Sequence, residues 1–141
     1  MTTTPTHRAT PSLRRHAYAA VGAVLLTALL WTAARGLGVE LRVDPGNGLP
    51  IQVVSLPLVV GSTLVVCLLA AAVRRRLDRL TGQAPTVWTR LAVTVLLLSL
   101  APMAYVQASG ATKAALTLMH LAVAAVLIPL LRHEQWAMSD R

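Results

Sequence analysis

Residues 87–131 read VWTRLAVTVLLLSLAPMAYVQASGATKAALTLMHLAVAAVLIPLL and contain only two charged side chains. The tripeptide Ala108-Ser109-Gly110 divides this stretch into two apolar runs of 21 residues each, 87–107 and 111–131. A helix needs about 20 apolar residues to cross the hydrocarbon core of a bilayer, so each run is long enough. Because the connection is so short, the stretch predicts two antiparallel transmembrane helices joined by a tight turn.

Two earlier runs have the same character, namely 17–37 with 21 residues and 51–73 with 23 residues. Apolar residues occupy every helical face of these runs rather than one stripe, as in helices surrounded by lipid. The sequence therefore predicts an all-α fold, a four-helix transmembrane bundle with up-down-up-down topology. We expect a single membrane domain over 17–131, a disordered basic cytoplasmic leader over 1–16 and a cytoplasmic tail over 132–141.

The composition excludes several other classes of protein. The chain is 55% hydrophobic and 13% charged, yet its formal net charge is +8. Nucleic-acid-binding domains carry Lys and Arg on a polar face, whereas the long runs here are almost free of charge, so we expect no nucleic-acid partner. A single Cys excludes an internal disulfide and a cysteine-based zinc site, and we expect no metal and no cofactor.

The distribution of basic residues predicts the orientation in the membrane. Ten of the 13 Lys and Arg residues precede the first span, lie between and beside spans two and three, or follow span four. By the positive-inside rule both termini are predicted to be cytoplasmic, in a multi-pass protein of the cell membrane. The Tyr and Trp residues near the span ends agree, since aromatic side chains favour the membrane interface.

The first span could also be interpreted as a cleaved signal peptide, because basic residues precede it and Thr32-Ala33-Ala34 offers small residues for cleavage. Its apolar stretch is longer than the 7–15 residues typical of such signals, so an uncleaved signal anchor is the better interpretation.

The connection between spans two and three is rich in arginine. Its candidate contacts with anionic lipid headgroups at the inner surface are Arg74, Arg75, Arg76 and Arg79, each worth about 1 kcal/mol near such a surface. The simpler interpretation, which we favour, is that these residues only fix the topology. The segment is predicted to extend the second helix to about Thr81-Gly82, and Pro85-Thr86 to begin the third.

The loop after the first span, residues 38–50, contains two local signals. Residues 39–43 alternate between apolar and polar side chains, which predicts a short extended segment. The Asp44-Pro45-Gly46-Asn47-Gly48 sequence that follows predicts a turn.

No Asp or Glu occurs inside a predicted span. Ion-coupled carriers normally need an intramembrane carboxylate, and the small multidrug exporters, which resemble this chain in size and span number, carry a Glu in their first helix. The carrier hypothesis is weakened accordingly. The polar residues near the predicted span midpoints are instead Thr27, Ser62, Thr63, Ser99 and His120. We expect them to face the bundle interior as one hydrogen-bonded layer around a neutral imidazole.

Lys113, Thr117 and His120 follow one another at i, i+4 and i+7 and so share one helix face. Two interpretations are open: the stripe lines an outward vestibule in which His120 binds or relays a proton or a small ligand, or it only holds helices together while Lys113 extends to the surface. The candidate intramembrane polar site comprises His120, Thr117, Lys113, Thr27, Ser62 and Ser99.

The sequence also resembles a known family. The similarity extends along the chain from the first span and is carried by Thr86-Val87-Trp88-Thr89, the run LLLSLAP at 96–102, Ala111-Thr112-Lys113 and the run MHLAVAAVLIP at 119–129. These segments resemble short four-helix actinobacterial membrane proteins of unknown function. The resemblance implies the architecture but no activity and no catalytic residues.

Three classes of function follow from these observations. A non-enzymatic membrane component or subunit fits best, because no clustered nucleophiles, acids or metal ligands suggest an enzyme. The alternative is a small oligomeric transporter or channel with a polar mid-membrane site around His120. The expected partners are the lipid bilayer, anionic headgroups at the inner surface, and a second copy of the chain or another membrane protein.

Overall fold

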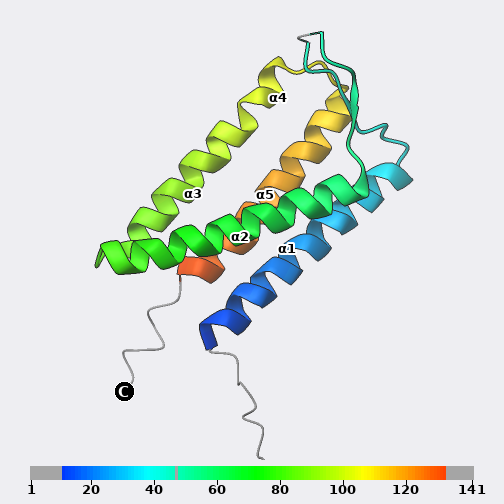
Figure 1. The fold of residues 1–141 in the computed structure, drawn as a ribbon. Helices are drawn as coiled ribbons and strands as arrows, with labels where there is room; N and C mark the ends of the chain where they lie inside the picture. The colour runs from blue at the N-terminus through cyan, green and yellow to red at the C-terminus, as the bar shows by residue number, and fades with distance from the viewer. Residues whose placement is uncertain (1–10, 47, 133–141) are drawn as a thin grey trace, which may run out of the picture.

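The computed structural model describes residues 11–46 and 48–132, and it consists mainly of long helices (Figure 1). The elements are α1 (Pro11–Gly36), β1 (Arg42–Val43), β2 (Gln52–Val53), α2 (Leu56–Leu80), α3 (Ala84–Leu100), α4 (Pro102–Tyr105) and α5 (Gly110–Arg132). The short α4 continues α3, and together they form one apolar span, Ala84–Tyr105. Within the described residues, four spans are long and apolar enough to cross a membrane. The predicted all-α, four-helix fold is confirmed.

The two ends of the bundle differ in what they contain. One end holds Pro11, the turn between α2 and α3, and Arg132, and we call it the terminal end (Figure 1). The other holds β1, β2 and the connection from α4 to α5, and we call it the hairpin end. Residues 1–10 of the expected leader and 133–141 of the expected tail lie outside the described residues.

The helix boundaries differ from the prediction at two places. Residues 11–16, expected in the disordered leader, form the first turns of α1. Proline is tolerated at Pro11, the first residue of the helix, because the N–H group of that position has no hydrogen-bond partner within the helix. The second helix begins at Leu56 rather than 51, because residues 52–53 form β2. It continues through the arginine-rich segment to Leu80, as the sequence predicted.

The loop after α1 forms a two-stranded antiparallel hairpin in which Arg42 is paired with Val53. Gly46 and Gly48 supply the positive φ angles of its turn, and the Asp44 carboxylate accepts a hydrogen bond from the Gly46 N–H at 2.8 Å. Asp44 and Gln107 exchange two backbone hydrogen bonds of 2.9 and 3.0 Å. The hairpin therefore connects the α1–α2 side of the bundle with the end of α4.

The helices do not pack equally against one another. α1 packs along both α2 and α5, and α3 packs along α5, whereas α2 and α3 make few contacts. The α1 contacts use Ala19, Ala23 and Ala34, which are buried and small enough to let helix backbones approach closely. In Figure 1, α2 and α3 meet at the turn that joins them and diverge toward the hairpin end.

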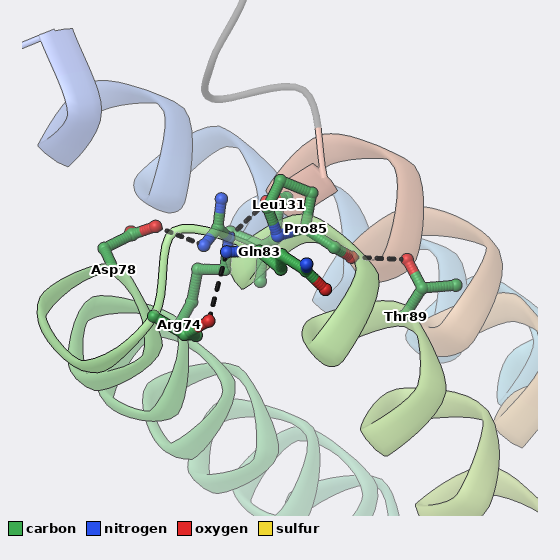
Figure 2. Close-up of polar contacts among 7 residues, drawn as sticks. Arg74, Asp78, Gln83, Pro85, Thr89 and Leu131 are labelled. Carbon is green, nitrogen blue, oxygen red and sulfur yellow. Dashed lines mark hydrogen bonds and ion pairs between the residues drawn. The ribbon is translucent and has the colours of Figure 1, made fainter.

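Arg74 joins α2 to the last turn of α5 at the terminal end (Figure 2). Its side chain is 0% exposed, its Nε donates a hydrogen bond to the Leu131 carbonyl oxygen at 2.7 Å, and its Nη1 forms an ion pair with Asp78. The positive guanidinium also lies at the negative end of the α5 helix dipole. A buried charge is tolerated only when it is paired in this way.

This placement of Arg74 corrects its assignment as a lipid-headgroup contact. Cys67, Ala70 and Arg74 are all buried, because spacings of three and four residues put them on one face of α2. Arg75, Arg76 and Arg79 are exposed and stay candidates for such contacts. The sequence shows four arginines close together, and only their positions around the helix axis determine that the first is buried and the others are exposed.

The Arg74 interaction predicts a large difference between neighbouring arginine substitutions. Arg74→Met leaves the Leu131 carbonyl without its charged donor, and we expect a loss of about 1–3 kcal/mol in the free energy of unfolding. Arg75→Met, on the exposed face, should change it by less than about 0.5 kcal/mol. Thermal unfolding of both variants in the same detergent measures the difference, and equal melting temperatures would contradict the role given to Arg74.

The orientation predicted from the basic residues is tested by cysteine accessibility in intact cells. Ile51→Cys places a thiol on the exposed hairpin, and Gly82→Cys places one in open space in the α2–α3 turn. A membrane-impermeant maleimide should label the first in intact cells and the second only after lysis. The reverse pattern would place the termini outside the cell.

Candidate functional site

A cleft of about 650 Å³ lies between α2, α3 and α5. Its α2 wall runs from Leu58 to Val73 and its α3 wall from Trp88 to Ser99, and α5 forms the floor from Leu116 to Ile128. The wall residues recur every three or four positions, as expected for one face of each helix. Most of them are apolar, and the exceptions are concentrated toward the hairpin end.

The cleft follows from how α2 is held. At the terminal end Arg74 ties α2 to α5, and farther along Thr63 contacts Thr27 of α1. At the hairpin end the Trp31 Nε1–H of α1 donates a hydrogen bond of 2.8 Å to the Val54 carbonyl, just before α2 begins. α2 therefore packs mainly against α1, while α3 packs mainly against α5. The space between α2 and α3 is left unfilled.

Five polar residues line the cleft and form what we call the polar band: Thr27, Ser62, Thr63, Ser99 and His120. All five were predicted to lie at one depth near the membrane midplane. Ser62 lies six residues after the start of α2, and Ser99 six residues before the end of α4, so each is about 9 Å from the hairpin end of its span. Thr27 and His120 lie within about one residue of the midpoints of their spans, His16–Gly36 and Gly110–Arg132, so only the α2 and α3 members of the band are shifted toward the hairpin end.

Thr27 and Thr63 form the one cross-helix contact within the polar band. Both are buried, and their hydroxyl oxygens are 3.4 Å apart. The Thr27 hydroxyl donates to the carbonyl of Ala23 at 2.9 Å, with Val24 at 3.1 Å. Since a hydroxyl has a single proton, Thr63 is then the donor to Thr27.

The other three members hydrogen-bond within their own helices. Ser62 donates to Val59 at 3.1 Å and Ser99 to Leu96 at 2.7 Å. His120 Nδ1 lies 2.7 Å from the Leu116 carbonyl oxygen. The five residues therefore share a cleft, but in the described part of the chain they are not joined into the single hydrogen-bonded layer that we expected.

The Leu116 contact also determines the tautomer of His120. A carbonyl oxygen can only accept, so Nδ1 carries the proton. In the neutral imidazole Nε2 then has a free lone pair, and no described residue donates to it. His120 thus presents an acceptor in a cleft that is otherwise mostly apolar.

The remaining members of the predicted site, Lys113 and Thr117, are half-buried and do not line the cleft. The buried residue of that turn is Thr112, which bonds through its hydroxyl and its N–H to Ser109 Oγ at the start of α5. The stripe from Lys113 to His120 is therefore divided, and only His120 reaches the cleft. This arrangement does not support a vestibule that begins at Lys113.

Sequence reasoning missed Trp88 as a cleft residue, because its position near a span end suggested an interfacial role. It is 5% exposed, and its Nε1–H is buried without a hydrogen-bond partner among the described residues. A signal was present in the spacing, since Ala84, Trp88 and Ala92 lie four residues apart and predict a packed helix face.

The described residues offer no arrangement for metal chemistry, since within 11–46 and 48–132 no three His, Cys, Asp or Glu side chains come together as a metal site would require. Cys67 is buried in the packed cluster of α1, α2, α3 and α5. His120 is therefore the one ionisable side chain among the cleft residues of the described chain.

Comparison with known proteins gives a family but no individual relative. No curated protein and no solved structure matches this chain. The sequence profile of a family of unknown function, DUF6069, matches residues 7–135 and so includes all four spans and every residue of the polar band. The chain, a four-helix protein with spans suited to a membrane, belongs to the DUF6069 family.

Proposed function

We propose that this chain is a non-enzymatic multi-pass protein of the cell membrane that binds an apolar, membrane-soluble small molecule in the cleft. The size of the cleft is the observation that carries the proposal. The cleft volume of about 650 Å³ is that of a small-molecule site. Small-molecule sites typically measure about 300–1,000 Å³ and are mostly apolar with a few polar groups.

The cleft is accessible from the side of the bundle. On its α2 wall Leu58, Val66 and Leu69 are exposed, and on its α3 wall Leu91 and Val95 are exposed. In a bilayer these side chains face lipid tails, so a ligand dissolved in the membrane can enter between α2 and α3 without crossing water.

The composition of the cleft favours binding over the alternative functions. A hydrolytic enzyme needs a nucleophile hydrogen-bonded to its base, whereas Ser62, Ser99 and His120 Nδ1 each donate to a carbonyl of their own helix. A small oligomeric transporter or channel around His120 needs a polar path across the membrane. From Val66 and Val123 to the terminal end, the cleft is lined by apolar side chains, so the polar band has no continuation.

The charged surface at the terminal end completes the proposal. The exposed Arg75, Arg76 and Arg79 suit the cytoplasmic leaflet, where anionic headgroups attract basic side chains. They provide orientation and a peripheral lipid contact, while the cleft provides the specific site.

Occupancy of the cleft can be tested with 1-bromohexadecane, whose bromine quenches tryptophan fluorescence, added to the full chain in lipid nanodiscs. Trp88 is the reporter, and its signal is the difference between the parent and a Trp88→Phe variant. We expect saturable quenching of Trp88. Ala124→Phe fills the cleft and should abolish the saturable component, because Ala124 is one of its lining residues.

Ala125→Phe is the matched control, since Ala125 is exposed and does not line the cleft. It should leave the quenching curve unchanged. Quenching that rises linearly with probe, or that Ala124→Phe does not alter, would show that the probe reaches Trp88 from bulk lipid and would contradict a binding site in the cleft.

A further inference from the structure

We infer that the ligand of the cleft is an uncharged molecule with a hydroxyl group, an alcohol or a phenol, which donates a hydrogen bond to the polar band while its apolar body extends toward Trp88. This inference rests on the proposed function and specifies the chemistry of the ligand. It follows from the direction of the hydrogen bonds around the cleft.

Each hydroxyl proton of the polar band already takes part in a hydrogen bond within the protein. Ser62 donates to Val59, Ser99 donates to Leu96, and Thr27 donates to Ala23, in each case to a carbonyl of the same helix. The remaining hydroxyl, that of Thr63, is 3.4 Å from Thr27 and donates to it. What these side chains retain is lone pairs, which can only accept.

His120 adds a further acceptor to the same cleft. Its Nδ1–H is occupied by the Leu116 carbonyl at 2.7 Å, and its Nε2 is an acceptor in the neutral ring. Apart from Thr27, whose hydroxyl oxygen accepts from Thr63, the polar band therefore presents hydroxyl oxygens and an imidazole nitrogen to which no described residue donates. The one donor of the cleft without a partner among the described residues, Trp88 Nε1–H, is buried and lies at the other end of the α3 wall.

This set of acceptors discriminates between ligand classes. A ketone, ester or ether brings only further acceptors, which stay unpaired in an apolar site and lower affinity. A carboxylate or phosphate would bring negative charge toward lone pairs, and an ammonium group would place a charge deep in the hydrocarbon, which is expensive. A neutral O–H group supplies the missing donor without charge.

The geometry of the cleft also predicts the orientation of the ligand. Ser99 and Trp88 are separated by 11 residues of α3, about 16 Å along the helix axis. The wall between them is formed by apolar side chains that include Leu91, Ala92 and Val95. A hydroxyl bound at the polar band therefore directs a long apolar chain toward the terminal end, with its far end close to Trp88.

The test compares 16-bromohexadecan-1-ol with its methyl ether, in the same nanodiscs and with Trp88 as the reporter. The two probes have equivalent chains and differ in the hydroxyl proton. One hydrogen bond predicts half-maximal quenching by the alcohol at a concentration lower by several-fold, up to about tenfold. His120→Leu and Ser99→Ala should each reduce this preference toward unity, whereas Thr117→Val, outside the cleft, should preserve it.

The outcomes distinguish this inference from the proposed function. If both probes quench equally and Ala124→Phe displaces both, the cleft binds apolar chains but the polar band does not select a donor, and the inference is overturned. Equal quenching would then indicate that water molecules, rather than the ligand, donate hydrogen bonds to the lone pairs of the polar band. A preference for the ether would overturn it as well, since the hydroxyl proton would then contribute nothing to binding. If Ala124→Phe affects neither probe, the proposed function itself fails.

Discussion

The buried guanidinium of Arg74 is the interaction on which the arrangement of the helices depends. It connects three features of the terminal end: its own helix, the Asp78 carboxylate one turn further on, and the last turn of α5 through the Leu131 carbonyl. A charge with 0% exposure has no water to solvate it, so the protein must supply every partner. If α2 separated from α5 at this point, the guanidinium would lose its hydrogen bond to the Leu131 carbonyl. The contact therefore strongly constrains the position of α2.

The cleft and its polar band are consequences of this constraint. With one end of α2 held against α5 and the rest held along α1 by Thr63 and by the Trp31–Val54 hydrogen bond, α2 cannot also lie along α3. The separation exposes the inner faces of both helices, including Ser62 and Ser99. These hydroxyls satisfy their protons on their own helices, as isolated polar groups in an apolar setting must. Because the serine hydroxyl protons are used within their own helices, the lone pairs of these hydroxyl oxygens stay available as acceptors in the cleft.

Length and hydropathy were enough to predict four spans, and Gly82 placed the end of α2 near Thr81, whereas the break between α3 and α4 was not predicted. Hydrophobicity alone could not show that residues 52–53 form a strand paired with β1. Ile51 to Val54 are on average as hydrophobic as the span that follows them, so the sequence shows no boundary there. The members of the polar band were identified by depth. Their bonding was not predictable, because a serine in a helix can bond to its own backbone or across to a neighbour, and only packing decides which. Arg74 was misassigned for a related reason: its burial depends on the register of α2 against α5.

The divergence of α2 from α3 between the terminal end and the hairpin end can be measured by double electron–electron resonance in nanodiscs. In a Cys67→Ala background, one spin-label pair at Arg76 and Val87 reports the terminal end and a second at Leu58 and Leu98 reports the hairpin end; all four residues are exposed. We expect a short, narrow distance distribution for the first pair and a clearly longer mean distance for the second. Equal mean distances at both ends would show that α2 and α3 pack side by side with no cleft between them, and that Arg74 does not set the position of α2 as described.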